Sequence, residues 1–226
     1  MLNFCTKNIR FKLHSAILLL LVFAVVIASP PIISEKLLSQ VRTLYGNAAN
    51  NRLLDWLALM DSYAEEDEME KLVIVNNFFN KMRFVNDIEH WGREDYWATP
   101  VEFLASSAGD CEDFSIAKYY TLKMMGVPVD RLRITYVKAL KLNQAHMVVT
   151  YYPAQSSVPL VLDNLNRNVL PATKREDLLP VYSFNADGLW LAKSRTKGLK
   201  VGKVTKIRLW DDLVMRIDSE MVNKAR

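Results

Sequence analysis

The sequence predicts an α+β protein in which helices pack against an antiparallel sheet. Three observations support this fold class. Apolar residues recur at helical spacing from residue 34 to 82, and a second strongly helical run spans 114–125 and stops before Gly126. The hydrophobic period then changes to two, in successive segments with short connections. Such connections favour antiparallel pairing.

The first helical stretch divides into about three helices. Apolar stripes around Leu37 and Leu53 are separated by Gly46, and the acidic run at 65–68 precedes the third stripe. Acidic residues at a helix start interact favourably with its dipole. Residues 86–100 (NDIEHWGREDYWATP) lack periodicity but carry two tryptophans, so we expect an irregular segment that packs over the protein, for example as one wall of a cleft.

A helix start is predicted at Asp110, a residue type suited to the N-cap position. Glu112 and Asp113 suit the first turn, and Gly126 suits the C′ position after the last turn. Cys111 would then occupy the first helical position.

The second half of the chain predicts strands at 131–139, 145–152 and 158–163. Residues 182–190 (YSFNADGLW) predict a hairpin or a covering loop. The basic stretch 193–208 is compatible with another strand and is expected to face solvent, although contact with an acidic partner or membrane headgroups stays open. Residues 208–222 predict a final helix.

The N-terminus resembles a secretory signal. Three basic residues precede an apolar run at 16–28, which is followed by Ser29 and two prolines. We expect cleavage after Ala28, which leaves 29–226 as a single domain. The alternative is an uncleaved membrane anchor, but the apolar run is shorter than the roughly 20 residues that span a bilayer. Either outcome places the domain outside the cytoplasm, and after cleavage no stable membrane insertion is expected.

The charge and the cysteine content limit the classes of function that the chain can have. The formal net charge of +4 includes three positive charges in residues 1–28, so the remaining domain carries 4 − 3 = +1 and predicts no nucleic-acid partner. The two cysteines are Cys5, which would leave with the signal, and Cys111. A lone thiol in an oxidising compartment is a liability unless it is used, although a buried inert cysteine is the ordinary alternative.

The position of Cys111 suits a nucleophile. Unpaired N–H groups and the dipole at a helix start stabilise a thiolate. The neighbouring carboxylates Asp110, Glu112 and Asp113 oppose this effect, because negative charges raise a thiol pKa. A second positive group is therefore required, either an imidazolium, a bound cation or both.

His146 and Asp163 complete a possible triad. His14 lies in the signal and His90 in the aromatic segment, whereas His146 lies in a predicted strand and Asp163 at the end of the next one. A carboxylate there can bond one imidazole nitrogen while the other nitrogen faces the thiol. Taken singly, a strand histidine is more often structural, and Asp163 is equally suited to a turn.

At this point the residues match a known family. The chain resembles the bacterial transglutaminase-like cysteine proteinases, and among them the LapG-type periplasmic proteases. The resemblance spans about residues 76–190. It rests on the segments 95–100 (DYWATP), 109–114 (GDCEDF), 145–148 (AHMV), 162–164 (LDN), 182–185 (YSFN) and 188–190 (GLW).

Several expectations follow from this resemblance alone. It implies a papain-like, transglutaminase-type core, in which the possible triad already identified from position, Cys111, His146 and Asp163, would be catalytic. It implies a periplasmic endopeptidase that cleaves the N-terminal region of a large surface adhesin beside a paired-alanine site and so releases cells from biofilms. An inner-membrane receptor for cyclic diguanylate would sequester the enzyme when that messenger is abundant. It also implies calcium as cofactor, with Asp110 and Glu112 as metal ligands.

The calcium expectation agrees with the chemistry of these side chains. Ca²⁺ takes six to eight oxygen ligands, so two or three adjacent carboxylates supply only part of a shell, and the segment 86–100 could supply more. A cation here would also offset the effect of the acidic residues on the thiol. Asp113 is a weaker candidate ligand. Simple pairing of these acids with the helix dipole is the alternative.

For the oxyanion, the N–H of Cys111 is one donor, and an indole N–H of Trp91 or Trp97 could be another.

Two other functions remain open. The same triad could transfer the acyl group to an amine, as a transglutaminase does, instead of to water. A catalytically inactive, calcium-dependent binding module is the other, and the presence of all three triad residue types argues against it.

Overall fold

The computed structural model describes residues 32–154, 157–192, 198–202 and 208–222. The predicted signal segment 1–28 and its cleavage site lie outside these ranges. Within them, no helix combines the length and the apolar character that a bilayer span requires.

The first half of the chain forms the three predicted helices, α1 (Glu35–Tyr45), α2 (Asn47–Ser62) and α3 (Glu68–Phe79). Local signals explain their ends. Ser34 and Asp67 are N-caps whose side chains accept the N–H groups of Leu37 and Glu70. Gly46 separates α1 from α2 with a φ of +85°, a conformation that glycine adopts without strain.

The segment 86–100 is less irregular than expected. It contains the short helix α4 (Asp87–His90), and a further helix, α5 (Pro100–Ser106), follows it. Thr99 and Glu102 form a capping box with proline at the first helical position. This signal was present in the sequence, and our prediction of the elements missed it.

The second half forms a seven-stranded antiparallel sheet in the order β10-β9-β8-β4-β5-β6-β7. Its strands are β4 (Leu132–Ala139), β5 (Gln144–Tyr151), β6 (Leu160–Leu162), β7 (Leu170–Pro171), β8 (Leu178–Asn185), β9 (Gly188–Ala192) and β10 (Gly198–Gly202). The three predicted strands are confirmed, and residues 182–190 form the β8–β9 hairpin. Two 3₁₀ turns, η1 (Val129–Arg131) and η2 (Ala172–Lys174), connect to the sheet.

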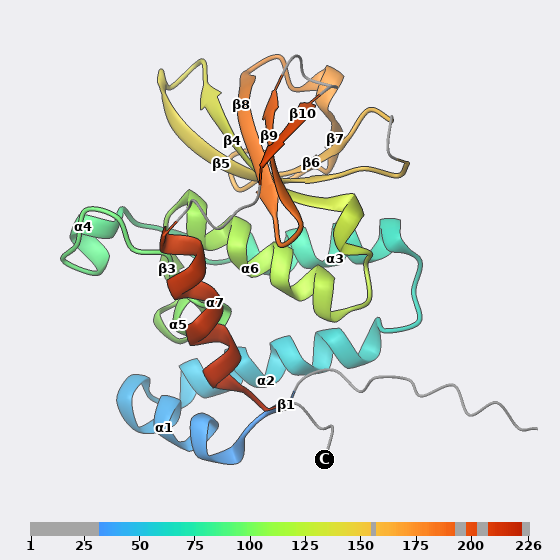
Figure 1. Cartoon of the computed structure of the whole chain (residues 1–226). Coiled ribbons are helices and arrows are strands. Elements are labelled where there is room, and N and C mark those ends of the chain that lie inside the picture. The colour runs from blue at the N-terminus through green and yellow to red at the C-terminus, as the bar shows by residue number, and fades with distance from the viewer. Residues whose placement is uncertain (1–31, 155–156, 193–197, 203–207, 223–226) are drawn as a thin grey trace, which may run out of the picture.

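Helix α6 (Cys111–Met124) lies at the centre of the molecule (Figure 1). It packs against β4 and β5 of the sheet and against α3 and α5 of the helical half. Because it is covered by both halves, ten of its fourteen residues are buried. Side chains from the helices and one sheet face form the main core, including Trp56, Phe79, Ile116 and Phe184. A smaller apolar cluster contains valines from β4, β5 and β6.

The C-terminal helix α7 (Arg208–Glu220) lies where a final helix was predicted. It contacts α5 and the segment before it. Arg216 donates to the backbone oxygen of Trp97 at 2.5 Å and to Oε2 of Glu102 at 2.6 Å. Two small ribbons complete the fold: β1 (Ile32–Ile33) pairs with β11 (Met221–Val222), and β2 (Arg83–Phe84) pairs with β3 (Ala108–Gly109).

Candidate active site

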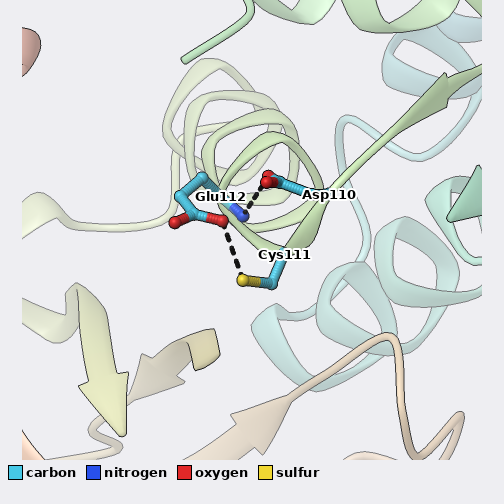
Figure 2. Close-up of side chains that lie close together, drawn as sticks. All are labelled: Asp110, Cys111 and Glu112. Carbon is cyan, nitrogen blue, oxygen red and sulfur yellow. Dashed lines mark hydrogen bonds between the residues drawn. The ribbon is translucent and has the colours of Figure 1, made fainter. Parts of the chain in front are cut away.

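The N-terminus of α6 places Cys111 at the first helical position, as predicted. Asp110 is the N-cap, and its Oδ1 accepts the N–H of Glu112 at 3.2 Å (Figure 2). Its own N–H donates to Oδ2 of Asp113 at 3.3 Å. This capping box fixes the direction in which α6 begins. Gly126 ends the helix with a φ of +85°.

The thiol of Cys111 lies between a carboxylate and strand β5. It donates to Oε2 of Glu112 at 2.8 Å (Figure 2), and the backbone N–H of Met147 donates to the sulfur. Burial, followed by the negative charges of Glu112 and Asp110, raises the pKa of the thiol. The N–H of Met147 opposes this shift but does not overcome it. The helix start therefore does not favour the thiolate by itself, which agrees with the prediction that a further positive group is needed.

Neighbouring strands bring His146 and Asp163 together. His146 lies on β5 and Asp163 directly follows β6, which pairs with β5. Nε2 of His146 and Oδ1 of Asp163 are 2.7 Å apart, and both side chains are almost fully buried. Oδ1 also accepts the N–H of Leu165 at 3.1 Å. Because the carboxylate accepts from Nε2, the imidazole carries its hydrogen there, and Nδ1 stays available as an acceptor.

A buried arginine contacts the other oxygen of Asp163. Nη2 of Arg175, which follows η2, is 2.6 Å from Oδ2 of Asp163 and 2.8 Å from Oδ2 of Asp177. Burial would raise the pKa of Asp163, but hydrogen bonds from His146 and Arg175 outweigh it and lower the pKa to about 2. Arg175 was not predicted from the sequence, because an arginine in a polar turn carries no local sign of burial.

The ionised state of Asp163 predicts a loss of stability in acid. A carboxyl group with a depressed pKa stabilises the fold above its unfolded value of 3.8 and loses that contribution as the pH falls toward 2. The shift corresponds to about 2 kcal/mol. We therefore expect the difference in free energy of unfolding between wild type and Asp163→Asn to shrink by about 2 kcal/mol from pH 5 to pH 2. Urea unfolding across this range measures it, and a difference that stays constant would contradict an ionised Asp163.

Acidic side chains gather at the start of α6. Ligand oxygens of Asp87, Asp110 and Asp113 lie within 4.8 Å of one another, and a second group joins Asp110, Cys111 and Glu112. Burial, together with the charges of neighbouring acids, raises the pKa of Asp87 to about 6 and that of Asp110 to about 10. The pKa of Asp113 is also raised, chiefly by burial. Asp110, Glu112 and Asp113 were predicted from the sequence as acids of this cluster, whereas Asp87 was not.

These carboxylates differ in how far the protein satisfies them. Asp113 accepts the N–H groups of Ala98 at 2.7 Å and of Asp110. Asp87 accepts the N–H of Tyr96 through Oδ2 at 2.6 Å, whereas its Oδ1 is buried without a hydrogen-bond partner among the described residues. A buried oxygen left unpaired beside two further carboxylates is costly, and a cation would satisfy it. The donor set of hard oxygens suits Ca²⁺.

Cys111 and His146 line the same cleft, which has a volume of about 590 Å³. Apolar side chains about half exposed, Phe84, Leu142 and Leu165, contribute to its walls. The other described lining residues are Asn86, Asp110, Glu112, Gln144, Ala145 and Asn164.

Neither tryptophan considered as an oxyanion donor belongs to the described lining. Trp97 stacks on Phe184 with ring centroids 5.9 Å apart, and its indole group bonds Asp95. Trp91 packs against Tyr96, and its Nε1 is buried without a hydrogen-bond partner among the described residues.

Comparison with known proteins agrees with this architecture. The family model for bacterial transglutaminase-like cysteine proteinases matches residues 57–191. The structure of EGTA-treated LapG from Legionella pneumophila is 44% identical, with a TM-score of 0.71, and the match covers 83% of this chain and 99% of that one. A calcium-bound structure of the same protein is 43% identical, with a TM-score of 0.68, and the match covers 80% and 98% of the two chains. Among curated proteins, none matches the sequence. The likeness to LapG confirms the predicted α+β fold.

Proposed function

The chain belongs to the bacterial transglutaminase-like cysteine proteinases, and from that membership we propose that it is an endopeptidase in which Cys111 is the nucleophile, His146 the base and Asp163 the residue that orients the base. The observation that carries this proposal is the 2.7 Å contact between Nε2 of His146 and Asp163, beside the cleft that also contains Cys111. This contact leaves Nδ1 of the imidazole free to take the proton of the thiol.

The reaction follows from these three groups. The Cys111 sulfur attacks the carbonyl carbon of the scissile peptide, and the imidazolium of His146 gives its proton to the leaving amine as the C–N bond breaks. His146 then takes a proton from water, which attacks the thioester and releases the thiol. The N–H of Cys111 has no partner within its helix, because it lies in the first turn, and is the candidate donor to the oxyanion.

The acidic cluster supports calcium as the cofactor. Asp110 and Glu112 are the ligands we propose, with Asp87 as a further one because its Oδ1 is buried and unpaired. Asp113 is less suited, since both of its oxygens already accept backbone N–H groups. When bound, calcium would supply positive charge that offsets the effect of the carboxylates on the thiol. The calcium-bound structure of the Legionella protein supports this choice of metal.

The LapG-type resemblance supports a specific substrate and partner. We propose that the enzyme acts in the periplasm on the N-terminal region of a large surface adhesin and so promotes release from biofilms. Its inhibitor would be an inner-membrane receptor responsive to cyclic diguanylate. The exposed side chains of Phe84, Leu142 and Leu165 agree with a protein substrate, because an extended chain can cover them as it crosses the cleft.

Cleavage is expected to require both calcium and Cys111. The purified protein is incubated with the N-terminal fragment of a large adhesin from the same cell, with calcium or with a chelator, and cleavage is followed on a gel. Cys111→Ala in calcium serves as the matched control and should leave the adhesin intact. Cleavage that persists in chelator would restrict Asp110 and Glu112 to capping α6.

An added primary amine distinguishes the alternative reaction. A hydrolase gives free carboxyl ends whether or not the amine is present, whereas an acyl transferase attaches the amine to the product. With a folded protein and a reduced thiol, uncleaved adhesin that has taken up the amine would favour the acyl transferase, and uncleaved adhesin without it would favour the inactive binding module.

A further inference from the structure

The guanidinium of Arg175 is held in one orientation behind the proposed catalytic residues. Nε and Nη2 bond both oxygens of Asp177, at 2.9 and 2.8 Å. A paired contact of this kind fixes the plane of the guanidinium group. The backbone is fixed as well, because the N–H of Arg175 donates to the oxygen of Ala172 and its own oxygen accepts the N–H of Leu178. Nη2 is thereby directed at Asp163.

Arg175 makes the shortest side-chain contact with the Asp163 carboxylate among the described residues. Its Nη2 lies 2.6 Å from Oδ2, while Oδ1 is shared between His146 and the N–H of Leu165. The buried Lys118 is the other nearby cation. It bonds Oδ1 of Asn80, whose amide donates to the backbone oxygen of Asp163, so it does not contact the carboxylate directly.

The buried contact between Arg175 and Asp163 is not well explained by its contribution to the stability of the fold. Arg175 is 1% exposed, and its Nη1 is buried without a hydrogen-bond partner among the described residues. Burying a charged group costs free energy, and the attraction within an ion pair often does no more than offset that cost. A buried N–H without a hydrogen-bond partner adds to it. The contact with Asp163 offers a functional reason for a buried arginine at this position.

We propose that Arg175 is a positioning residue that keeps the Asp163 carboxylate ionised and turned toward His146, and thereby holds the imidazole in the Nε2–H form. Without the guanidinium, Oδ2 becomes a buried unpaired charge, so the carboxyl group rotates or takes up a proton. A rotated carboxyl group no longer presents Oδ1 to Nε2, and a protonated one is a weaker acceptor, so either change reduces the preference for the Nε2–H form. Imidazole with its hydrogen on Nδ1 cannot accept the thiol proton through that atom. This inference rests on the proposed triad.

Arg175→Met is expected to lower kcat with calcium present by about 10-fold to 100-fold, the usual range for groups that orient a reacting side chain, with KM unchanged. Arg175→Lys restores the charge and should recover part of the loss. Arg131→Met is the matched control, because Arg131 of η1 makes a partly exposed ion pair with Glu68 of α3, and neither residue lines the cleft. Steady-state cleavage of an adhesin-derived peptide gives kcat and KM separately.

A second measurement needs no substrate. ¹⁵N-histidine NMR of the neutral imidazole should show the Nε2–H form of His146 in wild type and in Arg131→Met, and a mixture of both forms in Arg175→Met. If Arg175→Met does not fold, Asp177→Asn is used instead. It frees the guanidinium from its second partner, and a smaller change in the same direction is expected.

The outcomes separate this inference from the proposed function. A folded Arg175→Met, or Asp177→Asn in its place, with wild-type kcat and an unmixed Nε2–H form would overturn the positioning role while leaving the protease intact. If wild type cleaves no adhesin but Arg175→Met mixes the imidazole forms, the proposed substrate fails and the positioning role stands.

Discussion

Replacing His146 with glutamine is expected to lower kcat by about a million-fold, as removal of the base does in hydrolases whose nucleophile, base and orienting acid act as a unit. The reason lies in the thiol. Burial and the adjacent carboxylates raise the pKa of Cys111, so almost no thiolate forms unless a neighbouring base takes the proton. Glutamine retains hydrogen bonding to Asp163 but cannot accept that proton.

His90→Gln is the matched control, because it makes the same change at the described histidine outside the cleft. His90 ends α4 and packs against Trp91, with ring centroids 4.4 Å apart. Its replacement should leave kcat unchanged. Both variants are measured on the same adhesin fragment with calcium present, after their folding has been checked by thermal unfolding. Loss of activity in His90→Gln, with activity kept in His146→Gln, would reverse the assignment of the base.

Asp87→Asn is expected to abolish the response to calcium while stabilising the metal-free protein. Asp87 and Asp110 have raised pKa values, chiefly from burial, so they keep their protons in the folded protein at pH values where the unfolded chain has lost them. Metal-free stability should therefore fall as the pH rises from 5 to 8. The asparagine amide would remove one charge and place a donor where Oδ1 of Asp87 is now unpaired. The hydrogen bond from Tyr96 can remain, because asparagine keeps one acceptor oxygen.

Thermal unfolding with chelator and with calcium tests this expectation. Calcium at about 100 times its dissociation constant should stabilise wild type by about 2.7 kcal/mol, which raises Tm by about 5 to 10 °C. Asp87→Asn should show a higher Tm in chelator and no rise with calcium. Asp55→Asn, an exposed position on α2, should behave as wild type. A full calcium response in Asp87→Asn would remove Asp87 from the proposed ligands.

Most of the fold was predictable because its signals are local. The caps at Asp110 and Gly126 set the ends of α6, and period-two alternation located β4, β5 and β6. Helix α5 shows that a local signal can be present and overlooked, since its capping box was already in the sequence. The likeness to LapG agrees with the fold derived from these patterns.

Local sequence signals identified the side chains that could do chemistry: one cysteine at a helix start, one histidine in a strand and one aspartate at a strand end. Tertiary structure decided what surrounds them. Packing of α6 against β5 places the thiol beside Met147, and burial of the turn after η2 places Arg175 against Asp163. Asp87 meets Asp110 and Asp113 although it lies in a different helix. Such contacts join residues distant along the chain, and no spacing or cap encodes them, because they arise only when two halves of the protein bury a common core.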